Sequence, residues 1–372
     1  MNRTSLAALA AAAVIGTTGG VTVALNAAGD DDGGKPTADK SSSAATPKAE
    51  KSSGSAGKST ATPLYYADGA IHDGGTNVAV PTQTAAGDVR ALAAVDGGWL
   101  IVQVDTDSSG DEYYTGYYVP EDGDAWRIGE WRGNWDITTE RDKVVYGNGV
   151  TWHVATFADQ TTEPLDILDG SGKEPAYMDV VNSLNGVAIV DGGLVTGWKD
   201  GKTNRLVVTE EDHWTHQPWG PTGVDSPLSS PDGTQAVASY PNADYAPENP
   251  VGDCLTGGPA DDADAWWKEC EIGAASLEPW SPSGDRLLIR GTSSDGPGTS
   301  WVRVVDPLTN EKISEFDPTG LLSFAEWGDD DTVFTLAYDE TTNGAAIKRC
   351  DVAAAKCKVE KRVGDNAVLG SR

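Results

Sequence analysis

The chain has 372 residues, of which 38% are hydrophobic, and its formal net charge is −30. This charge argues against a nucleic-acid-binding protein, because phosphate binding requires a basic face, and against a polybasic attachment to anionic lipid. A sizeable core must be built largely from 13 Trp with Val, Leu and Ile, since the chain has only 4 Phe and 2 Met.

The first 63 residues differ in composition from the rest. Arg3 precedes an uncharged run rich in Ala, Val and Leu, so residues 1–28 are expected to be a signal peptide or a single membrane-spanning anchor. Residues 29–63 contain only small and polar residues with a few charges, which predicts a disordered tether. In both cases we expect the body to be exported, either secreted or on the extracellular face of the membrane, because the only nearby positive charge precedes the apolar run.

Residues 64–372 consist of short apolar segments separated by turns, without a sustained helical period. Six times, a polar or Gly-containing turn leads directly into a strongly apolar segment, at intervals of roughly 40 to 50 residues, the period of a four-stranded propeller blade. The pattern predicts an all-β domain folded as a six-bladed β-propeller. Seven blades are the alternative, because residues 65–81 could add a closing strand or part of a further blade. A pair of β-sandwiches explains such regular units less well.

The last two repeat units are the clearest. In the fifth unit we expect strands at residues 276–280, 286–290, 301–306 and 312–316, and in the sixth at residues 332–338, 345–350 and 357–362.

Three short motifs support the repeat. They are Ser-Pro-Asp-Gly at 230–233, Trp-Ser-Pro-Ser-Gly at 280–284 and Tyr-Tyr-Ala-Asp-Gly at 65–69. They resemble the repeats of TolB-like and WD-type β-propellers, and the resemblance extends over the body of the chain at the level of repeats. It implies the propeller fold and no particular activity, because propellers host many functions.

The four cysteines allow three pairings, and the local one is favoured: Cys254–Cys270 and Cys350–Cys357. Cys350 and Cys357 lie where the two arms of a predicted hairpin face each other. Neither pair has the spacing of a zinc or redox site, and disulfides agree with an exported body.

A search for reactive groups yields no catalytic residue. The chain has no G-x-S-x-G elbow, phosphate loop or dinucleotide fingerprint. His213 and His216 would point to opposite faces of a strand and could not share a metal ion. With 57 acidic residues, carboxylate pairs are too common for any one to be nominated.

Asp105, Asp107, Ser109 and Asp111 have the spacing that begins a calcium loop. Position twelve of that loop is Gly116 instead of Glu, and the flanks look like strands. We therefore favour a hairpin tip and expect no cofactor, with calcium as the one alternative.

Residues 240–271 form the most distinctive insertion, a cysteine-bracketed segment that carries Tyr245, Trp266 and Trp267. Aromatic residues in long loops on a rigid scaffold often bind partners; the alternative is that the two Trp residues only pack in a strand. The hypothesis is a non-enzymatic binding or scaffolding propeller outside the cytoplasmic membrane, monomeric in its body, with a protein or glycan partner. The alternative is an extracellular hydrolase or lyase with acidic residues in the channel.

Overall fold

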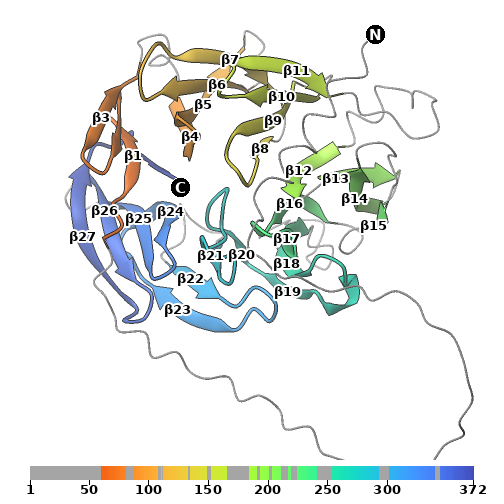
Figure 1. Ribbon diagram of the computed structural model, residues 1–372. Coiled ribbons are helices and arrows are strands. Elements are labelled where there is room, and N and C mark those ends of the chain that lie inside the picture. The colour runs from red at the N-terminus through yellow and green to blue at the C-terminus, as the bar shows by residue number, and fades with distance from the viewer. Residues whose placement is uncertain are drawn as a thin grey trace, which may run out of the picture.

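The computed structural model describes residues 60–80, 88–107, 110, 112–132, 135–148, 152–165, 184–190, 193–200, 203–210, 217–218, 224–240, 254–292, 301–339 and 344–372. Within these residues, strands form seven four-stranded antiparallel sheets, arranged side by side as a ring (Figure 1). The same residues contain no α-helix and one short 3-10 helix, η1 (Ala263–Ala265). The predicted all-β propeller is confirmed.

Sheets are numbered here in chain order, and each is given from its innermost to its outermost strand. Sheet 1 contains β28 (Val368–Gly370), β1 (Leu64–Ala67), β2 (Ala70–Asp73) and β3 (Thr76–Ala79). Sheet 2 contains β4 (Asp88–Val95), β5 (Gly98–Thr106), β6 (Glu112–Pro120) and β7 (Trp126–Trp131). Sheet 3 contains β8 (Trp135–Ile137), β9 (Lys143–Gly147), β10 (Trp152–Thr156) and β11 (Thr161–Leu165). Sheet 4 contains β12 (Leu184–Val190), β13 (Gly193–Asp200), β14 (Thr203–Glu210) and β15 (Gln217–Pro218).

The remaining three sheets follow the same order. Sheet 5 contains β16 (Asp225–Ser229), β17 (Gln235–Tyr240), β18 (Cys254–Pro259) and β19 (Trp267–Cys270). Sheet 6 contains β20 (Ile272–Ala274), β21 (Leu287–Gly291), β22 (Val302–Val305) and β23 (Lys312–Phe316). Sheet 7 contains β24 (Leu321–Asp329), β25 (Thr332–Asp339), β26 (Gly344–Asp351) and β27 (Lys356–Val363).

The six predicted repeat units correspond to sheets 2 to 7. The segment before them forms sheet 1 together with the C-terminal strand β28, which pairs antiparallel with β1 in the register Leu64↔Gly370. The ring therefore has seven sheets, the alternative that the sequence left open. Closure is made by β28, and the Cys350–Cys357 hairpin lies in the neighbouring sheet 7.

The core lies between the sheets. Separate clusters of buried side chains join sheets 1 and 2, 2 and 3, 5 and 6, 6 and 7, and 7 and 1, while β12 packs beside β8 and β16. Trp131 is completely buried between sheets 2 and 3, with its ring 4.9 Å from that of Tyr146. Second strands such as β5 are buried on both faces, which explains their continuous hydrophobicity, whereas the outer strand β27 is almost entirely exposed.

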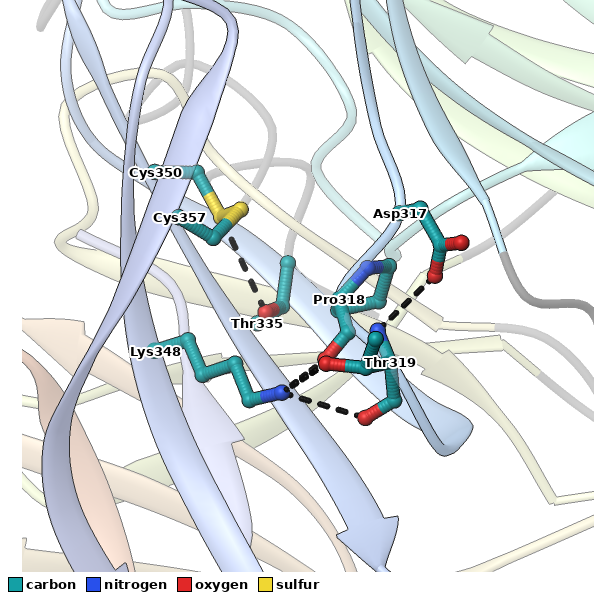
Figure 2. Close-up of a disulfide and its surroundings, with 7 residues drawn as sticks. All are labelled: Asp317, Pro318, Thr319, Thr335, Lys348, Cys350 and Cys357. Atoms are coloured by element: carbon teal, nitrogen blue, oxygen red, sulfur yellow. Dashed lines mark hydrogen bonds between the residues drawn. A yellow bond between two sulfur atoms is a disulfide. The ribbon is translucent and has the colours of Figure 1, made fainter.

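The two disulfides join the third and fourth strands of sheets 5 and 7. Cys254 is paired with Cys270 and Cys350 with Cys357, at directly opposite positions of the two strands. In Figure 2, Lys348 of β26 extends toward the connection between sheets 6 and 7, where its Nζ donates to the Pro318 carbonyl, to Thr319 O (3.1 Å) and to Thr319 Oγ1 (2.8 Å). The disulfide and Lys348 thus attach β26 to its outer neighbour and to the preceding loop.

The predicted anchor at residues 1–28 lies outside the described residues, and so does the predicted tether up to residue 59. Within the described part of the chain, no helix is long and apolar enough to cross a membrane. Ala61 already contacts the body, since its carbonyl accepts a hydrogen bond from Arg349 Nη2 of β26.

Removing either disulfide should destabilise the body by an amount that grows with the loop it closes. The sequence separations are 16 residues for Cys254–Cys270 and 7 for Cys350–Cys357, so replacing each pair by Ala should lower the free energy of unfolding by about 3 and about 2 kcal/mol, respectively. Denaturant unfolding of the full chain measures both values. The stability of a variant that lacks both cysteine pairs should not change when a reductant is added. If the wild type and all the variants were equally stable, the prediction would be contradicted.

Candidate functional site

The turns between the first and second strands of sheets 3, 5 and 6 lie close together, and Thr139 Oγ1 in the turn of sheet 3 donates to Pro231 O in the turn of sheet 5 (3.3 Å). In sheet 5, Ser230 Oγ donates to Asp232 Oδ1 (2.7 Å) and accepts from the backbone N–H of Gln235 (3.0 Å), while Gly233 N–H donates to Ser230 O (2.9 Å). Gly233 has a φ of 70°. The Ser-Pro-Asp-Gly motif thus forms a closed turn whose fourth residue occupies the left-handed region that favours glycine.

The turn of sheet 3 has the same hydrogen bonds with different residues. Thr138 Oγ1 donates to Asp142 Oδ1 (2.7 Å) and accepts from Lys143 N–H (3.1 Å), and Arg141 N–H donates to Thr138 O (2.8 Å). Arg141 therefore occupies the place of Gly233, with a φ of 59°. This conformation costs a residue with a Cβ roughly 1–2 kcal/mol, and such outliers are concentrated at functional sites.

The guanidinium of Arg141 connects several parts of the ring. Nη1 and Nη2 donate to the two carboxylate oxygens of Glu278 at 2.9 and 3.1 Å, a bidentate ion pair between the turn of sheet 3 and the segment after β20. Nε donates to Ala94 O of sheet 2 (2.6 Å), and Nη2 also reaches Ser371 Oγ (3.2 Å) beside the C-terminal strand. The pair is largely shielded from water, with side-chain exposures of 22% and 30%.

Two adjoining cavities occupy the channel at the centre of the ring. Their volumes are about 310 and about 260 Å³, and Asp136, Leu277, Glu278, Glu326 and Ser371 line both. These residues come from sheets 3, 6 and 7 and from the end of the chain. We call the two cavities together the channel site.

Glu326 is the most deeply buried acid of the channel site. It lies on the innermost strand β24 and is 7% exposed. Burial raises the pKa of Glu326 well above its ordinary value of 4.5, and the negative charge of Glu278 raises it further, while Ser276 and Arg141 oppose the shift. Burial thus favours the protonated, neutral form of this side chain over its carboxylate.

Three polar atoms of the channel site are buried without a hydrogen-bond partner. They are Glu326 Oε2, Ser276 Oγ and Trp280 Nε1. The Ser276 hydroxyl lies near Glu326 and affects its pKa, but no hydrogen bond of normal geometry satisfies either atom. Buried polar groups in folded proteins are almost always hydrogen-bonded, and these three are among ten such atoms without a partner in the described part of the chain. Trp280 borders the larger cavity, Ser276 the smaller one and Glu326 both.

The channel site places a deeply buried acid beside an acid in an ion pair. Glu278 forms the bidentate contact with Arg141, whereas burial raises the pKa of Glu326 and favours its protonated form. Such a pair can donate and accept hydrogen bonds at once, and in an enzyme it could divide acid and base roles. Among the described residues, no group of three or more His, Cys, Asp or Glu side chains could hold a metal ion.

The structure places Trp266 and Trp267 at the η1–β19 junction of sheet 5. Their indole N–H groups donate to the carbonyls of Pro259 (2.6 Å) and Pro307 (2.7 Å), and both rings are half-buried against the ends of strands. Tyr245 lies outside the described residues. Partner binding by these three aromatic residues stays a prediction.

The calcium hypothesis is likewise untested. Asp105 lies near the end of β5, and Asp107 forms an ion pair with Arg132 at 3.3 Å. Ser109 and Asp111 lie outside the described residues. The hairpin expected at this point is confirmed, because β5 pairs with β6 up to Thr106↔Glu112.

Sequence reasoning did not identify the channel residues. The expected strand at 276–280 was wrong: β20 covers Ile272–Ala274 and pairs with β21 from Ile272↔Gly291. Pro279 has no N–H to donate to a ladder, and the segment leaves the sheet and takes Glu278 into the channel. One signal in the sequence could have pointed to the channel: Arg141 stands in the turn of sheet 3 at the position that Gly233 occupies in the turn of sheet 5.

Replacing Arg141 separates its ion pair from its backbone strain. Arg141→Ala leaves Glu278 without its partner and keeps a Cβ at positive φ, so the free energy of unfolding should fall by about 2 kcal/mol. Arg141→Gly loses the same contacts but relieves the strain, so it should be about 1 kcal/mol more stable than Arg141→Ala. Denaturant unfolding of both variants measures the difference. Equal stabilities would refute the assigned turn conformation.

Glu326 should make stability depend on pH with a definite sign. Between 4.5 and its raised pKa, the folded state binds a proton that the unfolded state has released, so the free energy of unfolding falls as pH rises, by at most about 1.4 kcal/mol per unit. Glu326→Gln removes this loss. The stability difference between variant and wild type, followed by denaturant unfolding from pH 4 to 8, should be constant below 4.5 and grow above it. A constant difference throughout would contradict the buried acid.

No family model and no curated protein matches this chain. Among solved structures, TolB from Acinetobacter baumannii is similar at 10% identity and a TM-score of 0.42, covering 77% of this chain and 82% of that one. The β-propeller domain of the Trilobed protease from Pyrococcus furiosus matches at 12% and 0.46, covering 73% and 84%. Oligogalacturonate lyase from Vibrio parahaemolyticus matches at 12% and 0.46, covering 74% and 86%. The propeller assignment rests on the seven sheets of the chain itself.

Proposed function

We propose that the chain is a non-enzymatic binding propeller that takes the end of a saccharide into its channel site. The observation that carries the proposal is the group of buried polar atoms without partners, Glu326 Oε2, Ser276 Oγ and Trp280 Nε1. A ligand that hydrogen-bonds to them would remove a desolvation cost of roughly 1–3 kcal/mol for each.

The chemistry of these atoms favours hydroxyl groups. The indole N–H of Trp280 can only donate, whereas the Ser276 hydroxyl and Glu326, in the protonated form that burial favours, both donate and accept. A sugar hydroxyl also does both, so one ring can satisfy groups of either kind. Leu277, 53% exposed at the channel wall, adds an apolar surface for the C–H face of a sugar. The larger cavity, at about 310 Å³, has the size of a small-ligand pocket.

An exported location supports a glycan partner. Both disulfides require an oxidising compartment to form and persist, and the uncharged N-terminal run has the composition of an export segment. In this proposal the body is displayed or secreted outside the cytoplasmic membrane, where envelope polysaccharides are found.

A second candidate function is an acid–base enzyme in the same channel. It is favoured by the contrast between Glu326, whose pKa is raised by burial, and Glu278, which forms an ion pair with Arg141. A hydrolase or lyase would use the protonated acid to donate to a leaving group.

Two substitutions of Glu326 distinguish the candidates. Glu326→Gln keeps a donor and an acceptor, so binding of maltose, cellobiose or chitobiose, followed by saturation-transfer NMR and calorimetry, should change less than threefold. Glu326→Leu has a similar shape without polar atoms and should bind at least tenfold more weakly. Under the binding proposal, none of these disaccharides or their longer oligomers is cleaved by the wild type.

The enzyme alternative predicts a different pattern. Wild-type product formation, followed by chromatography, would then fall roughly 10²- to 10⁴-fold in Glu326→Gln while binding persisted. Thermal unfolding of each variant controls for folding. Binding that is unchanged in a folded Glu326→Leu variant, or absent for every saccharide, would refute the channel as a saccharide site.

A further inference from the structure

Two further arginines line the smaller cavity of the channel site. Arg90 comes from β4 of sheet 2 and Arg290 from β21 of sheet 6, so the ring brings together side chains that are 200 positions apart in the sequence. Arg90 is exposed and Arg290 is half-buried. Both border the same cavity of about 260 Å³.

Neither arginine has a carboxylate partner among the described residues. Most other arginines of this part of the chain do, namely Arg127, Arg132, Arg141, Arg286, Arg303, Arg349 and Arg372. In a chain with a net charge of −30, acidic side chains are plentiful. Two guanidinium groups at one cavity, with no carboxylate partner in the described part of the chain, are therefore an unusual local arrangement.

The acidic side chains of this cavity are Asp136, Glu278 and Glu326. Glu278 already forms a bidentate ion pair with Arg141, and burial raises the pKa of Glu326, which disfavours its charged form. Asp136 accepts a hydrogen bond from the Ile137 N–H (2.9 Å). Arg90 and Arg290 therefore add two positive charges to a cavity in which two of the three acids are compensated in this way, inside a strongly acidic protein.

We propose that the smaller cavity binds the carboxylate of an acidic saccharide through Arg90 and Arg290. This inference rests on the proposed function and names the ligand class. Guanidinium groups bind carboxylates through parallel, charge-assisted hydrogen bonds. Ser276 and Glu326, which border the same cavity, are left for the hydroxyl groups of the same ring. The channel site thus selects an acidic sugar over its neutral counterpart.

The test compares ligands that differ only in the carboxylate. Calorimetry of the full chain should show D-glucuronate binding at least tenfold more tightly than D-glucose, with only glucuronate weakened by added salt. The variant Arg90→Gln/Arg290→Gln should lose tenfold or more of the glucuronate affinity and keep that for glucose. A matched control is Arg127→Gln/Arg362→Gln, which removes the same charge from exposed positions on the outer strands β7 and β27. It should bind both sugars like the wild type.

The outcomes separate this inference from the proposed function. Equal binding of both sugars, unchanged by the Arg90/Arg290 variant, would overturn the carboxylate inference and leave saccharide binding standing. A third ligand, the dipeptide Ala-Ala, also carries a carboxylate. If Ala-Ala binds through Arg90 and Arg290 while both sugars fail, the carboxylate site stands and the saccharide proposal falls. If none of the three binds, both are overturned.

Discussion

The antiparallel pairing of β28 with β1 is the interaction on which the rest of the structure depends. It joins the two ends of the body in one sheet, in the register Leu64↔Gly370 to Tyr66↔Val368, and allows sheet 1 to pack against sheets 2 and 7. Each sheet alone would expose an apolar second strand, so the sheets are stable only when both faces are covered. Closure gives the last uncovered faces their partners.

The same closure creates the channel. Ser371 follows β28 directly, forms a bridge with Ala93 of sheet 2, and meets the Arg141 guanidinium. Arg141 then reaches Glu278 on the far side of the ring. These contacts join residues 230 and 137 positions apart, so they depend on the packing of distant sheets. The contact with Ser371 in particular needs the C-terminal strand to be in place. The geometry of the channel site is therefore a consequence of the tertiary fold.

Local patterns were enough to predict the strands and turns, but not the channel. The Ser-Pro-Asp-Gly turn, the buried strand after it and the two disulfides involve residues close in sequence, and the structure confirms them. The pairing of β28 with β1 and the contact of Arg141 with Glu278 join residues far apart, and a single sequence does not show which distant residues meet. Glu278 was also hidden because Pro279 was assigned to a strand that it cannot join. With 57 acidic residues, burial was the only property that could single out Glu326.

The charged groups of the channel differ from those of the molecule as a whole. A surface with a net charge of −30 repels anions over roughly a Debye length of 8–10 Å, yet in the channel burial favours the neutral form of Glu326, and Arg141 compensates the charge of Glu278. Packing does not require a carboxyl group at position 326, since an apolar side chain of similar size would fill the same volume without a buried polar group. The left-handed backbone of Arg141 adds strain for the same pair. The buried acid and the strained backbone are each avoidable by a common substitution, and both support the proposal that the channel site takes a ligand.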